Sequence, residues 1–340
     1  MGKIKMQERM IWLDNLKAYG IILVIIGHSI VITAANDSTG MLMKLIYSFH
    51  MPLFFFISGY LFRPNQENYF YKKWKVLLLP YLIFQMISVV FINVFYYIKM
   101  GGLERDPLNT LLSVFYINGT VGWNSPLWFL IVLLIIDLVF VSFNKLENKR
   151  WLQFTLVIAS CIIGWGLSET GIKYPFGIHI VFCCFCFYYL GNITKKYDLL
   201  GWLETNKNLR TLLFFISGIV LVINMIWLNG SKFISVYDNY YGTNYFLFLL
   251  SATSGILFSV LLIKQYNKMC SLTIFGKKAI LLLGTQYFLL LGFDKVGQVV
   301  GIYSEGTFYL IIKVVSVIVS YLILLSLWSK RGNKRLFRLK

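Results

Sequence analysis

Three ionisable residues lie on one side of an otherwise apolar segment, Met10 to Ser29, which reads MIWLDNLKAYGIILVIIGHS. Lys17 and His28 are eleven residues apart, about three helical turns, so their side chains share one helical face. Asp14, one turn before Lys17, falls on the same stripe. Because ionisable groups are costly in hydrocarbon, this pattern indicates a functional site. The alternative is that Lys17 reaches the interface beside a capping aspartate and that His28 has no role.

A second histidine, His50, occurs in the next apolar stretch, IYSFHMPLFFFISGYLF. If the two stretches are consecutive antiparallel spans, both histidines lie at similar depths in the same half of the bilayer. Histidine takes and gives a proton near neutral pH. The pair therefore predicts a polar, water-accessible cavity.

A run of basic residues follows the second stretch: Arg63, Lys72, Lys73 and Lys75. Topology alone is one explanation, because cytoplasmic loops of membrane proteins are generally basic. The functional alternative is a phosphate-binding site for an anionic cofactor. Lys17 would lie at the same level, with His28 about 16 Å deeper by helical rise. A long, thin molecule such as coenzyme A could extend from these bases to His28.

The elements that must position these residues are transmembrane helices. The 340-residue chain is 58% hydrophobic and 14% charged, with mean hydropathy +0.70, which excludes an ordinary soluble domain. We predict spans over residues 12–34, 45–62, 76–98, 126–143, 152–168, 176–193, 211–229, 245–263, 279–293 and 307–328. Most of the 32 lysines and arginines fall between spans on one side, which predicts two cytoplasmic termini. We expect one all-α integral membrane domain over residues 1–340, a bundle of about ten transmembrane helices.

Charge and cysteine usage exclude two further classes. The net charge of +18 would suggest nucleic acid for a soluble protein, but its place between apolar runs favours a bilayer-embedded protein that binds none. Cys183 and Cys186 have C-x-x-C spacing without a second pair, and we predict no metal site.

Several other side chains are candidates for binding. Residues 99–125 form the longest outer connection, and Tyr116, Trp123 and the nearby Trp128 could offer flat faces to a sugar or form an aromatic belt. Asp137 could pair with a lysine or line a cofactor channel, and we expect Lys313 to extend outward to the interface.

These motifs resemble the acyltransferase-3 family of bacterial membrane acyltransferases, most closely its fucose 4-O-acetylase-like and exopolysaccharide acyltransferase branch. Lys17 and His28 match the family signature of Arg or Lys, ten residues and His. FHMPLFFFISGYLF at 49–62 is a second match, and the later Pro80, PLWFL at 126–130 and YYLGN at 188–192 agree further. Two departures are K-K-W-K in place of the family's R-x-x-R, and Thr285 and Gln286 where many members carry a late histidine.

The resemblance implies transfer of an acyl group, by family default acetyl, from cytoplasmic acyl-CoA to a carbohydrate hydroxyl of a surface polysaccharide or its lipid-linked precursor. It places the protein in the bacterial cytoplasmic membrane and leaves homo-oligomerisation open. His28 would be the catalytic histidine and Lys17 its basic partner. From their distance along the helix, we ourselves expect Lys17 to bond cofactor oxygens and Asp14 to hold the Lys17 side chain. Lys72 to Lys75 would occupy the place of the basic cofactor-side motif.

As a mechanism we expect His28 to act as general base on the acceptor hydroxyl. His50 would orient His28, or hydrogen-bond the acceptor or the oxyanion. Ser29 and Ser58 are candidate nucleophiles for a covalent route. We rank that route below direct transfer, because small hydroxyls within spans usually bond their own helix.

A proton-coupled transporter or flippase for a glycan precursor is the main competing interpretation, since ten spans with buried histidine, aspartate and lysine also suit transport. We find no internal repeat and no matched pair of Gly- or Pro-broken spans, which disfavours it. A third interpretation, a non-enzymatic membrane assembly component, predicts that replacing His28 leaves function intact. Coenzyme A binding would separate the enzyme from the transporter.

Overall fold

The computed structural model describes residues 10–33, 37–63, 67–100, 107–228, 233–265, 273–304 and 306–336. Within these ranges ten helical stretches are long and apolar enough to cross a membrane, namely Ile11–Thr33, Thr39–Tyr60, Tyr69–Ile98, Ser125–Asn144, Arg150–Ser168, Pro175–Lys196, Lys207–Trp227, Tyr245–Gln265, Ala279–Val300 and Thr307–Trp328. The predicted all-α integral membrane bundle is confirmed.

These stretches are built from fifteen α-helices and short 3₁₀ or π segments in the described ranges. The helices are α1 (Ile11–Thr33), α2 (Asp37–Tyr47), α3 (His50–Tyr60), α4 (Tyr69–Lys73), α5 (Leu79–Met100), α6 (Pro107–Val114), α7 (Trp128–Asn144), α8 (Arg150–Ser168), α9 (Ile178–Lys196), α10 (Leu199–Thr205), α11 (Lys207–Ile223), α12 (Tyr245–Gln265), α13 (Thr273–Lys277), α14 (Ala279–Val300) and α15 (Thr307–Leu336). A small antiparallel hairpin joins β1 (Ile234–Ser235) to β2 (Tyr240–Tyr241), with Ile234 opposite Tyr241.

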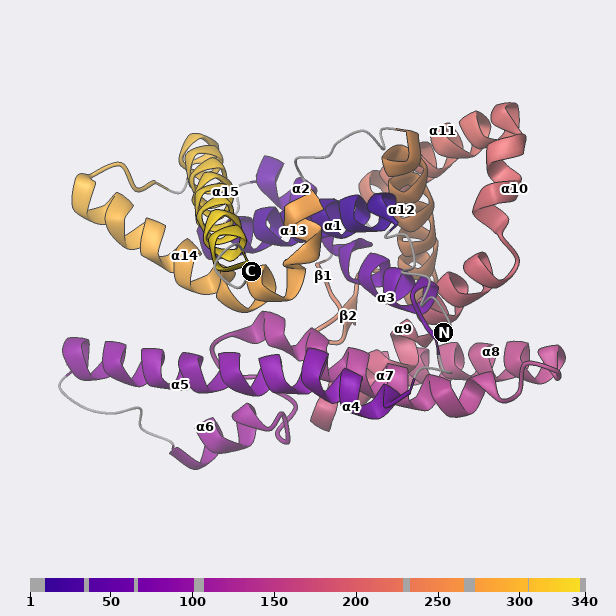
Figure 1. Cartoon of the computed structure of the whole chain (residues 1–340), viewed down its shortest axis with the longest axis horizontal. Helices are drawn as coiled ribbons and strands as arrows, with labels where there is room; N and C mark the ends of the chain where they lie inside the picture. Colours follow the sequence, from indigo (N-terminus) through magenta and orange to yellow (C-terminus); the bar gives the residue numbers. More distant parts are fainter. Residues whose placement is uncertain are drawn as a thin grey trace.

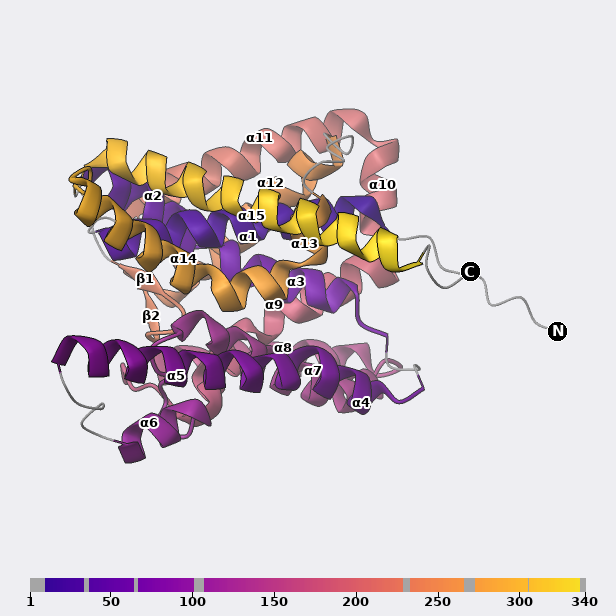
Figure 2. The same ribbon diagram turned by 60° about the vertical axis from the view of Figure 1, so that its left-hand side comes forward.

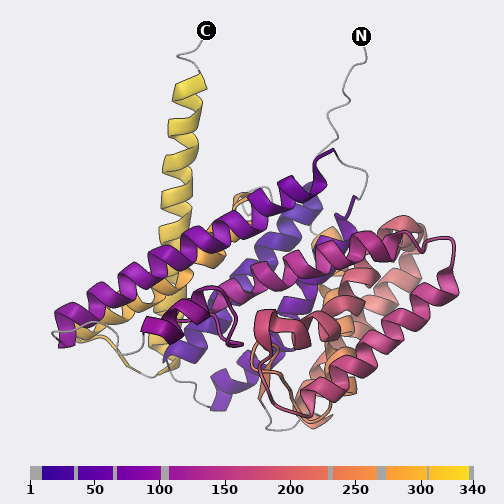
Figure 3. The same cartoon turned by 90° about the horizontal axis from the view of Figure 1, so that it is seen from below.

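The helices form two groups with the hairpin between them (Figure 1). Helices α4 to α8 lie on one side, and α1, α2 and α13 to α15 on the other. Figure 3 shows α5 crossing the face of the bundle that is seen from below. In Figure 2 the start of α1 and the end of α15 lie at the same end of the bundle, as an even number of spans requires, while β1, β2 and α6 lie at the opposite end. That the termini face the cytoplasm stays a prediction from charge.

Two glycines in the sequence motifs explain how α3 packs against α9. A Cβ at Gly59 would stand 1.9 Å from the carbonyl oxygen of Tyr188, and one at Gly191 would stand 2.0 Å from that of Phe56. Small residues allow backbones of membrane helices to approach this closely. The ISGYLF and YYLGN motifs therefore fix the position of α3, whose first residue is His50.

The third predicted span begins too late. The observed span begins at Tyr69 and includes α4 and a π segment, Trp74–Leu78. Lys72, Lys73 and Lys75 therefore lie on helical turns and not in a loop. Basic side chains at a span end can remain helical because their long stems carry the charge to water. The second span likewise begins earlier than predicted, at Thr39, and contains a turn just before His50.

The ninth predicted span ends too early, and the prediction for Lys313 is wrong. α14 continues to Val300 because Asp294 is not at the interface: its carboxylate pairs with the Lys313 ammonium at 2.7 Å. Lys313 is only 1% exposed and also donates to the Thr33 hydroxyl at 3.1 Å. A buried charge must be paired in this way. The pair joins α15 to α14 and to the end of α1.

Candidate active site

The bundle contains two neighbouring cavities. The first, here called the histidine cavity, has a volume of about 260 Å³ and is lined by Val24, His28, Val31, Tyr47, His50, Met51, Ser125, Pro126, Trp128, Phe233, Ser235, Val236, Tyr237, Asp238, Leu283 and Tyr287. The second, the lysine cavity, has a volume of about 400 Å³, and its charged lining residues are Lys17, Lys73, Asp137, Lys277 and Lys278. Met51 and Leu283 line both cavities, and we call the place between the cavities where these two side chains lie the neck. The predicted polar cavity around His28 and His50 is therefore present.

His28 is held by two tyrosines from distant parts of the chain. The hydroxyls of Tyr47 on α2 and Tyr287 on α14 lie 3.3 Å and 3.2 Å from its Nδ1. Both contacts use Nδ1, which leaves Nε2 as the nitrogen able to act on a ligand. When Nδ1 carries the hydrogen and donates it to a phenol oxygen, Nε2 has a free lone pair and can accept a proton.

His50 has a defined tautomer. Its Nδ1 lies 2.8 Å from the carbonyl oxygen of Ile46, and a carbonyl can only accept, so Nδ1 carries the hydrogen. Nε2 of neutral His50 is therefore an acceptor and cannot donate to an oxyanion. Of the roles expected for His50, accepting a hydrogen bond from an acceptor hydroxyl fits best, because Tyr47 and Tyr287 already orient His28.

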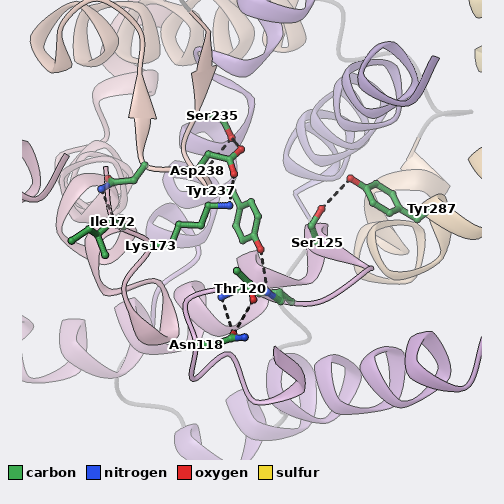
Figure 4. A network of polar contacts seen from close by, with 11 residues as sticks. Asn118, Thr120, Ser125, Ile172, Lys173, Ser235, Tyr237, Asp238 and Tyr287 are labelled. Carbon is green, nitrogen blue, oxygen red and sulfur yellow. Dashed lines mark hydrogen bonds and ion pairs between the residues drawn. The ribbon is translucent and has the colours of Figure 1, made fainter. Parts of the chain in front are cut away.

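The late span supplies Tyr287 and not Gln286. Gln286 is fully buried, donates weakly to the Leu283 carbonyl at 3.4 Å and does not line the histidine cavity. Tyr287, one residue later, contacts His28 and also Ser125, whose hydroxyl is 3.0 Å away. The Ser125–Tyr287 contact is drawn in Figure 4. No sequence pattern singled out Tyr287, because tyrosine is common in the spans of this chain.

In the lysine cavity, Lys73 is held in position by Asp137. Its ammonium donates to the Asp137 carboxylate at 2.7 Å, and the hydroxyls of Tyr69 and Tyr188 donate to the other oxygen. Asp137 is fully buried and lines the cavity, so its predicted pairing with a lysine is confirmed, while a role in a cofactor channel stays a prediction. Three donors on one buried carboxylate orient the group and lower its cost.

Lys277 and Lys278 complete the cationic wall and were not predicted. They follow Gly276 of α13, where a Cβ would stand 1.8 Å from the carbonyl oxygen of Asp14. The missing side chain lets α13 pack against the first turns of α1 and brings these lysines to Lys17. A conspicuous FGKK sequence before the late span was the available signal.

A family model described as an acyltransferase domain matches residues 10–325, nearly the whole chain. The chain belongs to the acyltransferase-3 family. With its ten apolar helices it is a multi-pass membrane acyltransferase. Comparisons with curated proteins and with solved structures find no match.

Other predicted cofactor-side residues of the acyltransferase do not reach either cavity. Lys72 and Lys75 are exposed, and Arg63, just after α3, does not line the lysine cavity. Asp14 is buried against α13 and is likewise not a lining residue, so it supports the site from behind. Helical spacing explains the difference, since of the three neighbouring lysines only Lys73 faces α7.

The three aromatic residues predicted for sugar binding lie in three different environments. Trp128 lines the histidine cavity and stacks on Tyr237, with ring centroids 6.2 Å apart and an interplanar angle of 24°. Trp123 lies behind Tyr287, 6.1 Å between centroids. Tyr116 contradicts the prediction: it is fully buried beside Gly177 and has no face for a sugar. Burial also raises the pKa of Tyr116, so the phenol is neutral.

The hairpin segment 233–241 supplies the remaining wall of the histidine cavity, which the sequence analysis missed. Phe233, Ser235, Tyr237 and Asp238 all line the cavity. Figure 4 shows Asp238 near Ser235 and Lys173, and Tyr237 reaching toward the 118–125 segment. Only turn-like composition marked this segment in the sequence.

The candidate nucleophiles of a covalent route are poorly placed for it. The Ser29 hydroxyl is fully buried and donates to its own helix at the Ile25 carbonyl, 2.7 Å away. Ser58 lines the lysine cavity, on the other side of the neck from His28. Within the described ranges, no group of three or more His, Cys, Asp or Glu side chains could hold a metal ion.

Proposed function

We propose that the protein transfers an acyl group, by family default acetyl, from acyl-CoA to a hydroxyl of a carbohydrate, with His28 as general base. The observation that carries the proposal is that the two cavities adjoin, with Met51 and Leu283 lining both of them. One cavity offers cations and the other offers histidines and phenols. A thioester donor with an anionic head and a long arm requires both in that order.

The lysine cavity is suited to the phosphates of coenzyme A. Lys17, Lys73, Lys277 and Lys278 present four ammonium groups against the single carboxylate of Asp137. Lysine binds phosphate as a point charge, so these flexible chains can adapt to several phosphate positions. The remaining lining is largely apolar, which suits the pantetheine arm. Helical rise puts His28 about 16 Å beyond Lys17, a span that an extended arm can cover.

In the transfer step, Nε2 of His28 removes the proton from the acceptor hydroxyl while that oxygen attacks the thioester carbonyl. The tetrahedral intermediate then collapses: the carbon–sulfur bond breaks, the new ester bond remains, and the departing thiolate takes the proton from His28. A phenol that accepts from Nδ1 keeps its own hydrogen, so Tyr47 and Tyr287 can donate to the oxyanion. His50 accepts from the acceptor.

Topology adds the two sides of the membrane to this proposal. The lysine cavity is formed near the ends of the spans where the basic segments gather, so it faces the cytoplasm by the positive-inside rule. The histidine cavity is lined by the hairpin segment, and the hairpin lies at the opposite end of the bundle (Figure 2). We infer an enzyme of the bacterial cytoplasmic membrane that acylates a surface polysaccharide or a lipid-linked precursor, in line with the fucose 4-O-acetylase-like branch.

The test is acetyl-CoA turnover and coenzyme A binding by purified protein in nanodiscs, wild type beside His28→Ala and His28→Gln. We expect coenzyme A binding in all three and a loss of turnover of roughly 10²- to 10⁴-fold in both variants, the usual contribution of a general base. Folded protein without coenzyme A binding would refute the proposal. Full turnover in His28→Gln would remove His28 from the chemistry.

A further inference from the structure

The hairpin segment 233–241 contributes nothing to the proposed base or to the lysine cavity, yet it forms one wall of the histidine cavity. It connects α11 with α12 at the end of the bundle away from the start of α1 and the end of α15 (Figure 2). Phe233, at its start, is 38% exposed and lies 6.2 Å from Tyr47 by ring centroids. An exposed ring on a cavity wall is available to a ligand.

The segment is anchored to its surroundings. The Tyr237 oxygen accepts from the backbone N–H of Val121 at 3.1 Å, and the Tyr237 ring stacks on Trp128. Asn239 donates to the carbonyls of Leu167 and Ile172 at 2.8 Å and 3.0 Å. Burial raises the pKa of Tyr237, which keeps the phenol neutral. The wall is therefore rigid, as a recognition surface should be.

Asp238 is the charged group of this wall. One carboxylate oxygen pairs with the Lys173 ammonium at 2.5 Å, and the other accepts from the Ser235 hydroxyl at 2.6 Å. Figure 4 shows these partners from the hairpin and from the loop before α9. A carboxylate offers about four acceptor positions. The side chain is 40% exposed, so it is oriented and still able to accept hydrogen bonds.

We propose that Asp238 recognises the acceptor, by accepting a hydrogen bond from a hydroxyl next to the one that is acylated. This inference rests on the proposed acyl transfer. The Phe233 ring would cover the apolar face of the same sugar ring. The acceptor class is then a polyol with hydroxyls on neighbouring carbons, and a simple alcohol would be a poor substrate. A site built to bond a hydroxyl strongly rejects an analogue that lacks it.

The competing explanation is that Asp238 only stabilises the hairpin turn through Ser235 and Lys173. The chain offers a matched comparison. Lys173→Met removes the ion pair and the contact of the ammonium with the Tyr237 ring, 4.5 Å from the ring centroid, and leaves the carboxylate. Asp238→Asn keeps the size of the side chain and removes its charge. A purely structural role predicts the same result for both variants. Recognition predicts a larger effect for Asp238→Asn. Tyr240→Phe is the control, because Tyr240 is exposed on β2 and does not line the cavity.

The experiment uses full-length protein in nanodiscs with acetyl-CoA and a panel of methyl hexosides and methyl 6-deoxyhexosides. Monodeoxy analogues of the best acceptor are then compared between wild type and variants. We expect Asp238→Asn to raise the acceptor KM by about 10- to 100-fold, the range for a hydrogen bond to a charged group, and to retain coenzyme A binding. One monodeoxy analogue should have the same KM with wild type and with Asp238→Asn, because it lacks the hydroxyl that would donate to Asp238. Lys173→Met should change KM by less than about 5-fold, as for an exposed ion pair.

Equal KM changes in Asp238→Asn and Lys173→Met would overturn the inference, as would an Asp238→Asn defect confined to kcat. The inference would also be overturned if Asp238→Asn raised KM by the same factor for every monodeoxy analogue as for the intact acceptor. Folded wild-type protein that binds no coenzyme A would refute the proposed function itself, and this inference with it. The two failures are therefore distinguished by the coenzyme A measurement.

Discussion

The two cavities differ in how their polar groups are held. In the lysine cavity, four ammonium groups on flexible stems line the same space as one carboxylate, which holds Lys73. In the histidine cavity, each histidine Nδ1 has a specific oxygen partner, and the hairpin wall is bonded to three other segments. Binding an anion tolerates loose geometry, since Coulomb attraction falls slowly with distance. Moving a proton does not, because it requires atoms at hydrogen-bond distance.

The largest effect is expected where the two cavities join. Met51→Trp should fill the neck and reduce acyl transfer by at least about 100-fold, because a small displacement of reacting groups costs that much. Coenzyme A binding should remain, since the lysines are untouched. Transfer and binding are measured on the same nanodisc samples, with Met51→Ala as the control that widens the neck.

Leu283→Trp repeats the test from the other wall, in case Met51→Trp does not fold. A wild-type transfer rate in a folded variant with a filled neck would show that the two cavities do not hold one donor molecule between them.

A smaller effect is expected in the lysine cavity. Lys73→Met should raise KM for acetyl-CoA by about 10- to 100-fold with a much smaller change in kcat, since it removes a charged contact to the donor. Lys72→Met is the matched control, because Lys72 is exposed and lies outside the cavity. Michaelis constants for acetyl-CoA, measured at two salt concentrations, check the prediction.

Lys73→Met also leaves the buried Asp137 carboxylate without its counterion, which destabilises the fold. The double variant Lys73→Met/Asp137→Asn removes that charge and should recover stability but not donor affinity. If its KM for acetyl-CoA returned to the wild-type value, Lys73 would have only a structural role.

The smallest effect is expected within the histidine cavity. Tyr287→Phe removes one of two phenols at His28 and should lower kcat by only about 5-fold, because Tyr47 remains as a donor to the oxyanion. Donor KM should be unchanged. Tyr321→Phe is the control, because it loses a 2.8 Å contact to Thr285 without touching the cavity. Equal losses in both variants would indicate general loosening of α14, and not a role at His28.

Much of the scaffold could be predicted from local pattern. Hydropathy located all ten spans, and its errors came at span ends. The span at 279–293 was cut short because Asp294 has the character of an end residue, while its partner Lys313 comes 19 positions later. Hydropathy is averaged over neighbouring residues of the sequence. A charged residue whose partner lies on another helix is therefore taken for the end of a span.

The site was predictable only in part. The sequence by itself determined that Lys17 and His28 share a helical face and that His50 lies at a similar depth, because helical geometry and antiparallel spans follow from local rules. Tertiary structure alone decided that Tyr287 contacts His28, since 259 residues separate them. It also chose Lys73 over Lys72 and Lys75, and placed Asp238 in the cavity wall. Those contacts depend on how helices pack, through glycines such as Gly59, Gly191 and Gly276 that set the distances between backbones.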